Sequence, residues 1–247
     1  MASPPATPGR GGNPLADLAR RWQDPAVRAI SRLIPADVLW FVDTDAPVFA
    51  LTFDDGPSPE TTPQLLDVLA RHRAHATFFL IGERVRAHPR LVRAITAAGH
   101  EIANHLMRDE RSALIPDHRF RRDLAETNAL LTPYGPVRWF RPGSGWFTPR
   151  MLRSAAQQNL RAVLGTLVAA HHGRPDDDRI AADLLAGIRP GSIVVLHEGT
   201  PNRRGVARTT DELLTALAGR GPAAVTVSEL AGPADPAGPA TADSDAR

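Results

Sequence analysis

The chain has 247 residues, 43% of them hydrophobic, which is enough to bury a sizeable core in one large domain. Its formal net charge of +2 gives no reason to expect nucleic acid or another polyanion as a partner. Cysteine is absent, so disulfides and thiolate metal sites are excluded, and any metal ion must be bound by histidine and carboxylate side chains.

No segment has the length and hydrophobicity of a signal peptide or a membrane span. The N-terminal residues contain no apolar core of signal-peptide length. The most apolar later segment, residues 29–42, is interrupted by Arg32, Pro35 and Asp37 and is shorter than the roughly 20 residues that a span requires. We therefore expect a cytoplasmic protein with no membrane span, and a secreted one if the true start of translation lies further upstream.

Composition divides the chain into tails and one domain. Residues 1–14 and 231–247 are rich in Pro, Gly and Ala and are predicted to be disordered. Residues 15–46 are predicted to form a helical extension, and residues 47–230 a single domain. Nothing in the sequence indicates the oligomeric state.

Strand and helix patterns alternate along this domain. The predicted strands cover residues 47–53, 76–82, 100–105, 137–141, 161–167, 192–197 and 223–230. The predicted helices cover residues 60–72, 89–99, 117–135, 148–160, 179–187 and 208–221. About seven repeated strand–helix units predict an α/β fold in which parallel strands form a (β/α) barrel.

Polar side chains with catalytic potential follow the ends of several predicted strands. They are Asp54, Asp55, His105, Arg141 and His197. The carboxyl ends of the strands meet at one face of such a barrel, so we expect these side chains to converge there. Two adjacent carboxylates at the end of a buried strand repel each other, so this pair requires a nearby cation or has a proton to transfer.

A second pattern predicts part of a metal site. His105 and Asp109 are spaced i, i+4, so on a helical turn both would face the same way. With Asp55 they would make three ligands with open positions, which is typical of a catalytic metal. Taken alone, His105 and Asp109 are better explained as a solvent-exposed pair, and the metal site is indicated only together with the Asp-Asp-Gly strand end at residues 54–56.

Five segments, in this order, give the chain a resemblance to a known family. They are "LTFDDGP", "ATFFLIGERV", "GHEIANH", "FRPGSGW" and "IVVLH". Over residues 47–230 the chain resembles the polysaccharide deacetylase family, which is the nodulation-B homology domain of the family-4 carbohydrate esterases. The resemblance implies a distorted (β/α) barrel, one divalent metal ion and hydrolysis of an acetyl group on a carbohydrate.

The resemblance also implies roles for individual residues. Asp54 would be the general base, held by Arg141, and Asp55 and His105 would be metal ligands. Leu196 would line the acetyl pocket, and His197 would protonate the leaving amine.

The glycine-rich third motif would contribute to substrate binding. The backbone N–H of Ser144, with Gly145 beside it, would stabilise the oxyanion. Trp146 would form an apolar wall for a sugar ring, although packing in the core explains it equally well.

The sequence departs from the family pattern in two places. Asp109 stands where the second motif usually has a histidine, so a site of Asp55, His105 and Asp109 would favour Mn²⁺, Fe²⁺ or Mg²⁺ relative to Zn²⁺ or Co²⁺. The aspartate that orients the acid histidine in many members is replaced by Thr166. Glu198 is a poor substitute because neighbouring side chains on a strand point to opposite faces.

Together these features predict a metal-dependent hydrolase of a non-peptide C–N bond, acting as an N-deacetylase on an acetylated amino sugar or polysaccharide. One alternative is a cytoplasmic hydrolase of another small amide, such as a formyl or cyclic imide group. The other is a catalytically silent carbohydrate-binding protein on the same barrel.

Overall fold

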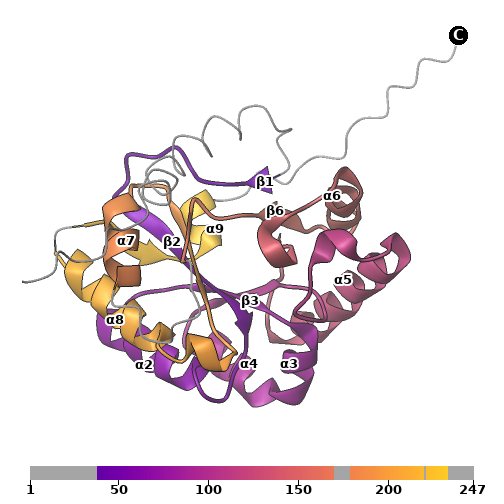
Figure 1. Ribbon diagram of the computed structural model, residues 1–247, viewed down its shortest axis with the longest axis horizontal. Helices are drawn as coiled ribbons and strands as arrows, with labels where there is room; N and C mark the ends of the chain where they lie inside the picture. The colour runs from indigo at the N-terminus through magenta and orange to yellow at the C-terminus, as the bar shows by residue number, and fades with distance from the viewer. Residues whose placement is uncertain (1–37, 170–178, 220, 233–247) are drawn as a thin grey trace, which may run out of the picture.

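The computed structural model describes residues 38–169, 179–219 and 221–232 (Figure 1). The predicted tail at residues 1–14, and most of the two segments predicted for residues 15–46 and 231–247, lie outside this range. The strands are β1 (Val38–Leu39), β2 (Val48–Gly56), β3 (Thr77–Leu80), β4 (Glu101–Asn104), β5 (Trp139–Phe140), β6 (Arg161–Val163), β7 (Leu167–Val168), β8 (Ile193–His197) and β9 (Ala223–Val225).

Helices follow most of the strands. The α-helices are α2 (Thr62–His72), α3 (Gly82–Ala87), α4 (Pro89–Ala97), α5 (Asp117–Leu131), α6 (Pro149–Ala156), α7 (Arg179–Gly187), α8 (Val206–Leu217) and α9 (Val227–Ala231). The 3-10 helices are η1 (Ser112–Leu114), η2 (Thr132–Tyr134), η3 (Gly143–Gly145) and η4 (Pro201–Arg203). None of the helices in the described ranges is long and apolar enough to cross a membrane.

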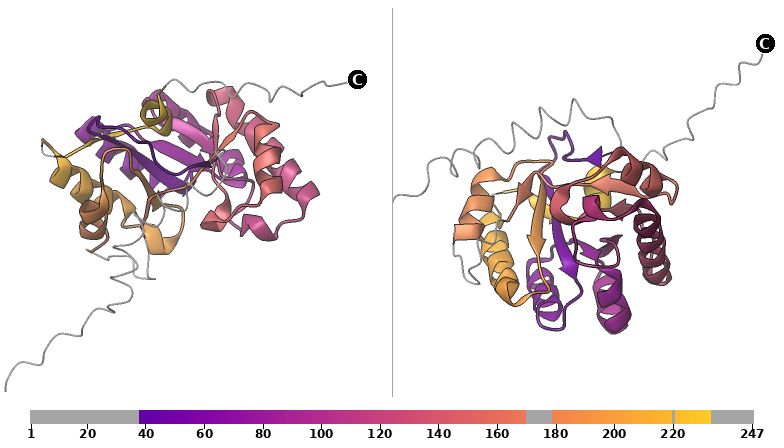
Figure 2. Two further views of the ribbon diagram at one scale, coloured as in Figure 1. Left: turned by 90° about the horizontal axis from the view of Figure 1, so that it is seen from above. Right: turned by 45° about the vertical axis from the view of Figure 1, so that its right-hand side comes forward.

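The described strands form one parallel sheet in the order β1-β6-β5-β4-β3-β2-β8-β7, with β9 paired to the start of β2. The sheet curls into a half-barrel, and the longer helices lie around its outside (Figures 1 and 2). The predicted distorted (β/α) barrel is confirmed, with nine short strands in the described region instead of about seven.

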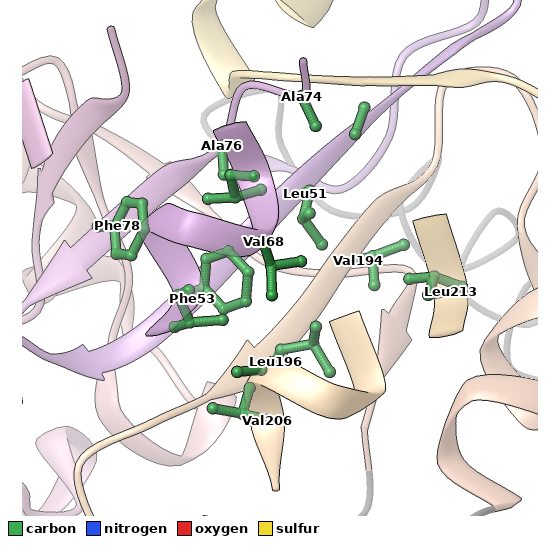
Figure 3. Close-up of a cluster of buried hydrophobic side chains, with 14 of the residues drawn as sticks. Leu51, Phe53, Val68, Ala74, Ala76, Phe78, Val194, Leu196, Val206 and Leu213 are labelled. Carbon is green, nitrogen blue, oxygen red and sulfur yellow. The ribbon is translucent and has the colours of Figure 1, made fainter. Parts of the chain in front are cut away.

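The central strand β2 shows how the sequence specifies the two faces of the sheet. Phe49, Leu51 and Phe53 alternate along it and pack in the main hydrophobic core against helices α2 and α8 (Figure 3). Thr52 and Asp54 occupy the intervening positions and are buried on the other face. The barrel interior therefore contains polar groups, whereas the space between sheet and helices is apolar.

Two segments differ from the sequence-based expectation. From residue 38 onward, the segment predicted as a helical extension contains strand β1, which pairs with β6. The segment predicted as a strand over residues 223–230 contains strand β9 followed by helix α9. Helix α9 begins at a capping box, in which Thr226 accepts a hydrogen bond from the backbone N–H of Glu229 and Glu229 accepts one from the backbone N–H of Thr226.

Candidate active site

The two aspartates at the end of β2 are both buried. Asp54 is 3% exposed and Asp55 is 4% exposed. Asp55 has a left-handed φ of 69°, a conformation that aspartate tolerates better than most residues. Each carboxylate has its own positively charged partner, which explains how the chain buries two adjacent acidic residues.

Asp54 pairs with Arg141 inside the barrel. Nη1 of Arg141, just after β5, lies 2.6 Å from Oδ1 of Asp54 and also donates to the hydroxyl of Thr52. The guanidinium lies 3.9 Å from the ring centroid of Phe79. Burial lowers the pKa of Arg141, while the charge of Asp54 opposes that effect. The buried ion pair holds Asp54 in one position.

Asp55 pairs with His105, which directly follows β4. Nδ1 of His105 lies 2.8 Å from the carbonyl oxygen of Arg141, and because a carbonyl can only accept, Nδ1 carries a proton. Nε2 of His105 lies 3.1 Å from Oδ1 of Asp55. A carboxylate oxygen and an oriented imidazole nitrogen at this separation fit two ligands of one divalent ion.

Charge coupling is strong around these groups. Burial would raise the pKa of Asp55, but the hydrogen bond and charge of His105, together with the charge of Arg203, hold it well below its usual value. Burial would lower the pKa of His105, but the charges of Asp54 and Asp55 raise it. The site therefore favours a carboxylate at Asp55 and a positive charge beside it.

Asp109, the third predicted ligand, does not lie with the other two. Its side chain is 53% exposed, and its carboxylate lies 4.0 Å from the guanidinium of Arg84. Among the described residues, no group of three or more His, Cys, Asp or Glu side chains is placed to hold a metal ion. The structure thus brings together Asp55 and His105, and the role of Asp109 stays a prediction.

His197 reaches the site as the last residue of β8. Its Cα is the register partner of Asp54 in the parallel β2–β8 pair. Burial lowers the pKa of His197, and the negative charges of Asp54 and Asp55 partly oppose this. His197 therefore lies close enough to both carboxylates for their charges to act on its ring, as expected from its position at the end of a strand.

Leu196 lies elsewhere than predicted. It is fully buried in the main hydrophobic core, near Val206 (Figure 3). Because side chains alternate along β8, the residue before His197 faces the helices and not the barrel interior. In this structure Leu196 therefore packs in the core, and its role in an acetyl pocket stays a prediction.

The third motif forms the loop after β5. Ser144 and Gly145 belong to the 3-10 helix η3, and Gly145 has a positive φ of 66°. The N–H of Gly143 donates to the Ser112 hydroxyl at 2.7 Å, which ties this loop to helix η1. Trp146 is 73% exposed, which excludes the alternative that it packs in the core.

Three residues at the site were not predicted. Arg84 donates to the backbone carbonyl of Asp55, Arg203 pairs with the Asp55 carboxylate, and Glu198 lies fully buried behind both aspartates. In a chain whose basic residues are all arginine, composition cannot distinguish Arg203 from the exposed arginines around it.

The orienting group for His197 is not found where the sequence suggested it. The Thr166 hydroxyl bonds to the backbone of Ile193, at the opposite end of β8 from His197. His171 and His172, and the acidic residues at 175–178, are further candidates in the sequence for a polar group near His197, and they lie outside the described residues.

Comparison with known proteins gives consistent matches. A family model described as polysaccharide deacetylase matches residues 41–163. A chitooligosaccharide deacetylase of Sinorhizobium fredii is 40% identical over 161 residues, which cover 64% of this chain and 75% of that protein.

Solved structures of similar proteins share the fold. A peptidoglycan N-acetylglucosamine deacetylase in complex with 4-naphthalen-1-yl-N-oxidanyl-benzamide superposes with a TM-score of 0.75 and 28% identity, covering 81% of this chain and 95% of that one. A family 4 acetyl xylan esterase from Clostridium thermocellum, in complex with a cobalt ion, has a TM-score of 0.67 and 31% identity, covering 74% of this chain and 90% of that one. With its five motifs in order on a curled parallel sheet, the chain belongs to the polysaccharide deacetylase family, as a nodulation-B-type member of the family-4 carbohydrate esterases.

Proposed function

We propose that the protein is a metal-dependent N-deacetylase that acts on an acetylated amino sugar within a glycan. The observation that carries this proposal is the convergence of Asp54, Asp55, His105, Arg141 and His197 at the carboxyl ends of four strands. One of the similar proteins is named as a chitooligosaccharide deacetylase and another as a peptidoglycan N-acetylglucosamine deacetylase.

Asp55 and His105 are the residues that would hold the ion, with Asp109 as a candidate third ligand. The family member from Clostridium thermocellum that carries cobalt supports a divalent ion here. When bound, such an ion lowers the pKa of water and stabilises negative charge on a carbonyl oxygen. The two carboxylates predicted as ligands favour Mn²⁺, Fe²⁺ or Mg²⁺ relative to Zn²⁺ or Co²⁺.

Asp54 is proposed as the general base. Its carboxylate is fixed by Arg141 at 2.6 Å, which leaves its second oxygen to accept the proton of the attacking water. Because Arg141 is itself buried and held by Thr52, Asp54 has little freedom to move away from the reacting atoms.

His197 is proposed as the general acid for the leaving nitrogen. Burial lowers the pKa of this histidine, so its protonated ring is a stronger acid than an exposed imidazolium. The two nearby aspartates supply the negative charge that keeps a proton available on the ring. The exposed indole of Trp146 offers an apolar face for the sugar.

The variant Asp54→Asn tests the proposal. We expect acetate release from N-acetylated chitooligosaccharides, assayed with Mn²⁺, Co²⁺ or Zn²⁺, to fall by about 10²–10⁴-fold, the usual contribution of a general base. Metal content by elemental analysis should be unchanged, because Asp54 is not a proposed ligand. The matched control is Asp67→Asn, an exposed carboxylate on α2, which should leave the rate unaltered. A wild-type rate in Asp54→Asn would remove Asp54 as the base.

A second candidate is a catalytically silent carbohydrate-binding protein, favoured by the exposed position of Asp109. A silent barrel would bind chitooligosaccharides without releasing acetate and would retain no divalent ion. Release of formate or of a ring-opened product from small amides, with no turnover of glycans, would instead identify the small-amide hydrolase.

A further inference from the structure

Glu198 is a buried carboxyl group that the proposed mechanism does not use. It directly follows His197 and is 0% exposed. Its Oε2 accepts hydrogen bonds from the hydroxyls of Thr61 and Thr62, each at 2.7 Å. Its Oε1 has no hydrogen-bond partner among the described residues. Burial raises the pKa of Glu198 to about 7, which reflects the cost of burying its charged form. An apolar side chain would be easier to bury at this position.

The backbone of Glu198 also contacts the catalytic segment. Its N–H donates to the carbonyl oxygen of Asp54 at 3.0 Å, which continues the β2–β8 pairing past His197. Its carbonyl accepts from Nη1 of Arg203, the same nitrogen that pairs with the carboxylate of Asp55. Glu198 is thus linked to both catalytic-motif aspartates through separate contacts.

The turn after the aspartates is shaped around this carboxyl group. A Cβ atom added to Gly56 would lie 2.1 Å from Oε1 of Glu198. Only glycine therefore leaves room for the Glu198 side chain against the end of β2. Beyond Gly56, the chain returns to Thr61 and Thr62, which are buried at the start of helix α2 and bonded to the same carboxylate.

We propose that Glu198 is a positioning residue that fixes the Asp54–Asp55 turn against His197 by anchoring Thr61 and Thr62 through its carboxylate oxygen. Glu198 does not touch the reacting atoms. It closes the segment between β2 and α2 into a rigid turn whose two ends are both held by Glu198. The kcat measurement below rests on the proposed function, whereas the hydrogen-exchange measurement does not.

The test compares Glu198→Met with Glu198→Gln. Met is similar in length, but its thioether is only a weak hydrogen-bond acceptor. We therefore expect kcat to fall about 10- to 100-fold, the loss typical of misplaced catalytic groups, with KM within about twofold of wild type. Gln keeps an oxygen acceptor for both threonine hydroxyls, so its kcat should stay within about threefold. Equal damage in both variants, or a normal kcat in Glu198→Met, would overturn the proposal.

A second readout is independent of turnover. Hydrogen exchange of the segment from Asp54 to Leu65, followed by mass spectrometry, should be about tenfold faster in Glu198→Met and unchanged in Glu198→Gln. If wild-type protein releases no acetate from any glycan, the proposed function fails and this exchange measurement alone decides the role of Glu198. Unchanged exchange in Glu198→Met would then overturn it.

The matched control is Glu101→Gln. Glu101 also accepts a threonine hydroxyl, that of Thr77, but at the start of β4, away from the catalytic edge. Its substitution should leave kcat and the exchange of the Asp54–Leu65 segment unchanged. If Glu198→Met does not fold, the double variant Thr61→Val/Thr62→Val removes both contacts from the other side, and a normal kcat in that variant would equally contradict the proposal.

Discussion

At the scale of single residues, the site depends on charges that are buried in pairs. Arg141 contacts Asp54, and His105 and Arg203 contact Asp55, so each carboxylate has its own basic partner inside the barrel. Removing one member of such a pair leaves an uncompensated buried charge, which costs roughly 3–5 kcal/mol in buried ion pairs generally. The aspartates therefore require their partners for folding as well as for the proposed chemistry.

His100 makes stability depend on pH at the other end of β4. Its ring is buried near Phe78 and lies 6.1 Å from the ring of His75, which itself contacts Glu229. Burial, and then the charge of His75, lower the pKa of His100 to about 4. The unfolded chain binds a proton at His100 more readily than the folded chain does. The contribution of neutral His100 to the free energy of unfolding is therefore fully present above the unfolded pKa and is lost as the pH falls toward 4.

We expect the free energy of unfolding in urea to fall by about 1.5 kcal/mol between pH 6.5 and pH 5 because of His100 alone. The variant His100→Phe should lose that part of the pH dependence, since phenylalanine does not titrate. His118→Gln, an exposed histidine on α5, serves as the control and should keep the wild-type profile. An unchanged profile in His100→Phe would show that His100 is not the group responsible.

Some residues of the site can be predicted from the sequence and others cannot. Asp54, Asp55, His105, Arg141 and His197 could be predicted because a polar residue at the end of an apolar run shows in the sequence itself. Arg203 and Glu198 could not, because their contacts depend on how a loop folds back on β2. The exposed position of Asp109 depends in the same way on a loop whose course the sequence pattern does not specify.

At the scale of elements, the end of β2 leaves little steric freedom at Gly56. A methyl group on Gly56 would collide with Oε1 of Glu198 and approach the Leu80 side chain to 3.1 Å. We expect Gly56→Ala to lower the free energy of unfolding by about 1–3 kcal/mol, as overpacking usually does.

The cause of that loss can be checked with a second substitution. Adding Glu198→Ala removes the colliding oxygen, so the double variant Gly56→Ala/Glu198→Ala should lose less stability than the sum of the two single variants, by thermal or urea unfolding. Strict additivity would place the strain of Gly56→Ala somewhere other than Glu198.

Local sequence signals set the boundaries of some helices and strands, but not of all. The strand predicted over residues 223–230 ends at Val225 because Thr226 and Glu229 form a capping box that starts helix α9. The spacing of Thr226 and Glu229 is visible in the sequence, but the alternating apolar residues around this pair predict a strand instead of a helix. Strand β1 has only two residues and exists through its pairing with β6, so no local pattern could predict it.

At the scale of the whole molecule, β2 is the strand with the most neighbours. It pairs with β3, β8 and β9, and its side chains contribute to the main core on one face and to the polar interior on the other. The (β/α) repeat in the sequence predicts this parallel architecture. The spatial order of the strands, and the half-barrel shape, follow from packing that the repeat alone does not specify.

Hydrogen exchange should reflect this arrangement. We expect the amides of β2 between Phe49 and Asp54 to be among the slowest in the protein, exchanging only through global unfolding, because they lie between two paired strands. The amides of β7, at the end of the strand order, should exchange faster through local opening. Equal rates for β2 and β7 would mean that the sheet opens as one unit.

The pairing of β2 with β8 also has a consequence for folding during synthesis. Asp54 and His197 are neighbours in the sheet, yet one lies in the first strand of the main domain and the other close to its end. During synthesis, a nascent chain can complete the early helices and strands while the catalytic edge still lacks its last strand. The edge that carries Asp54 is therefore completed only when nearly the whole domain has left the ribosome, and a chain truncated before β8 lacks His197.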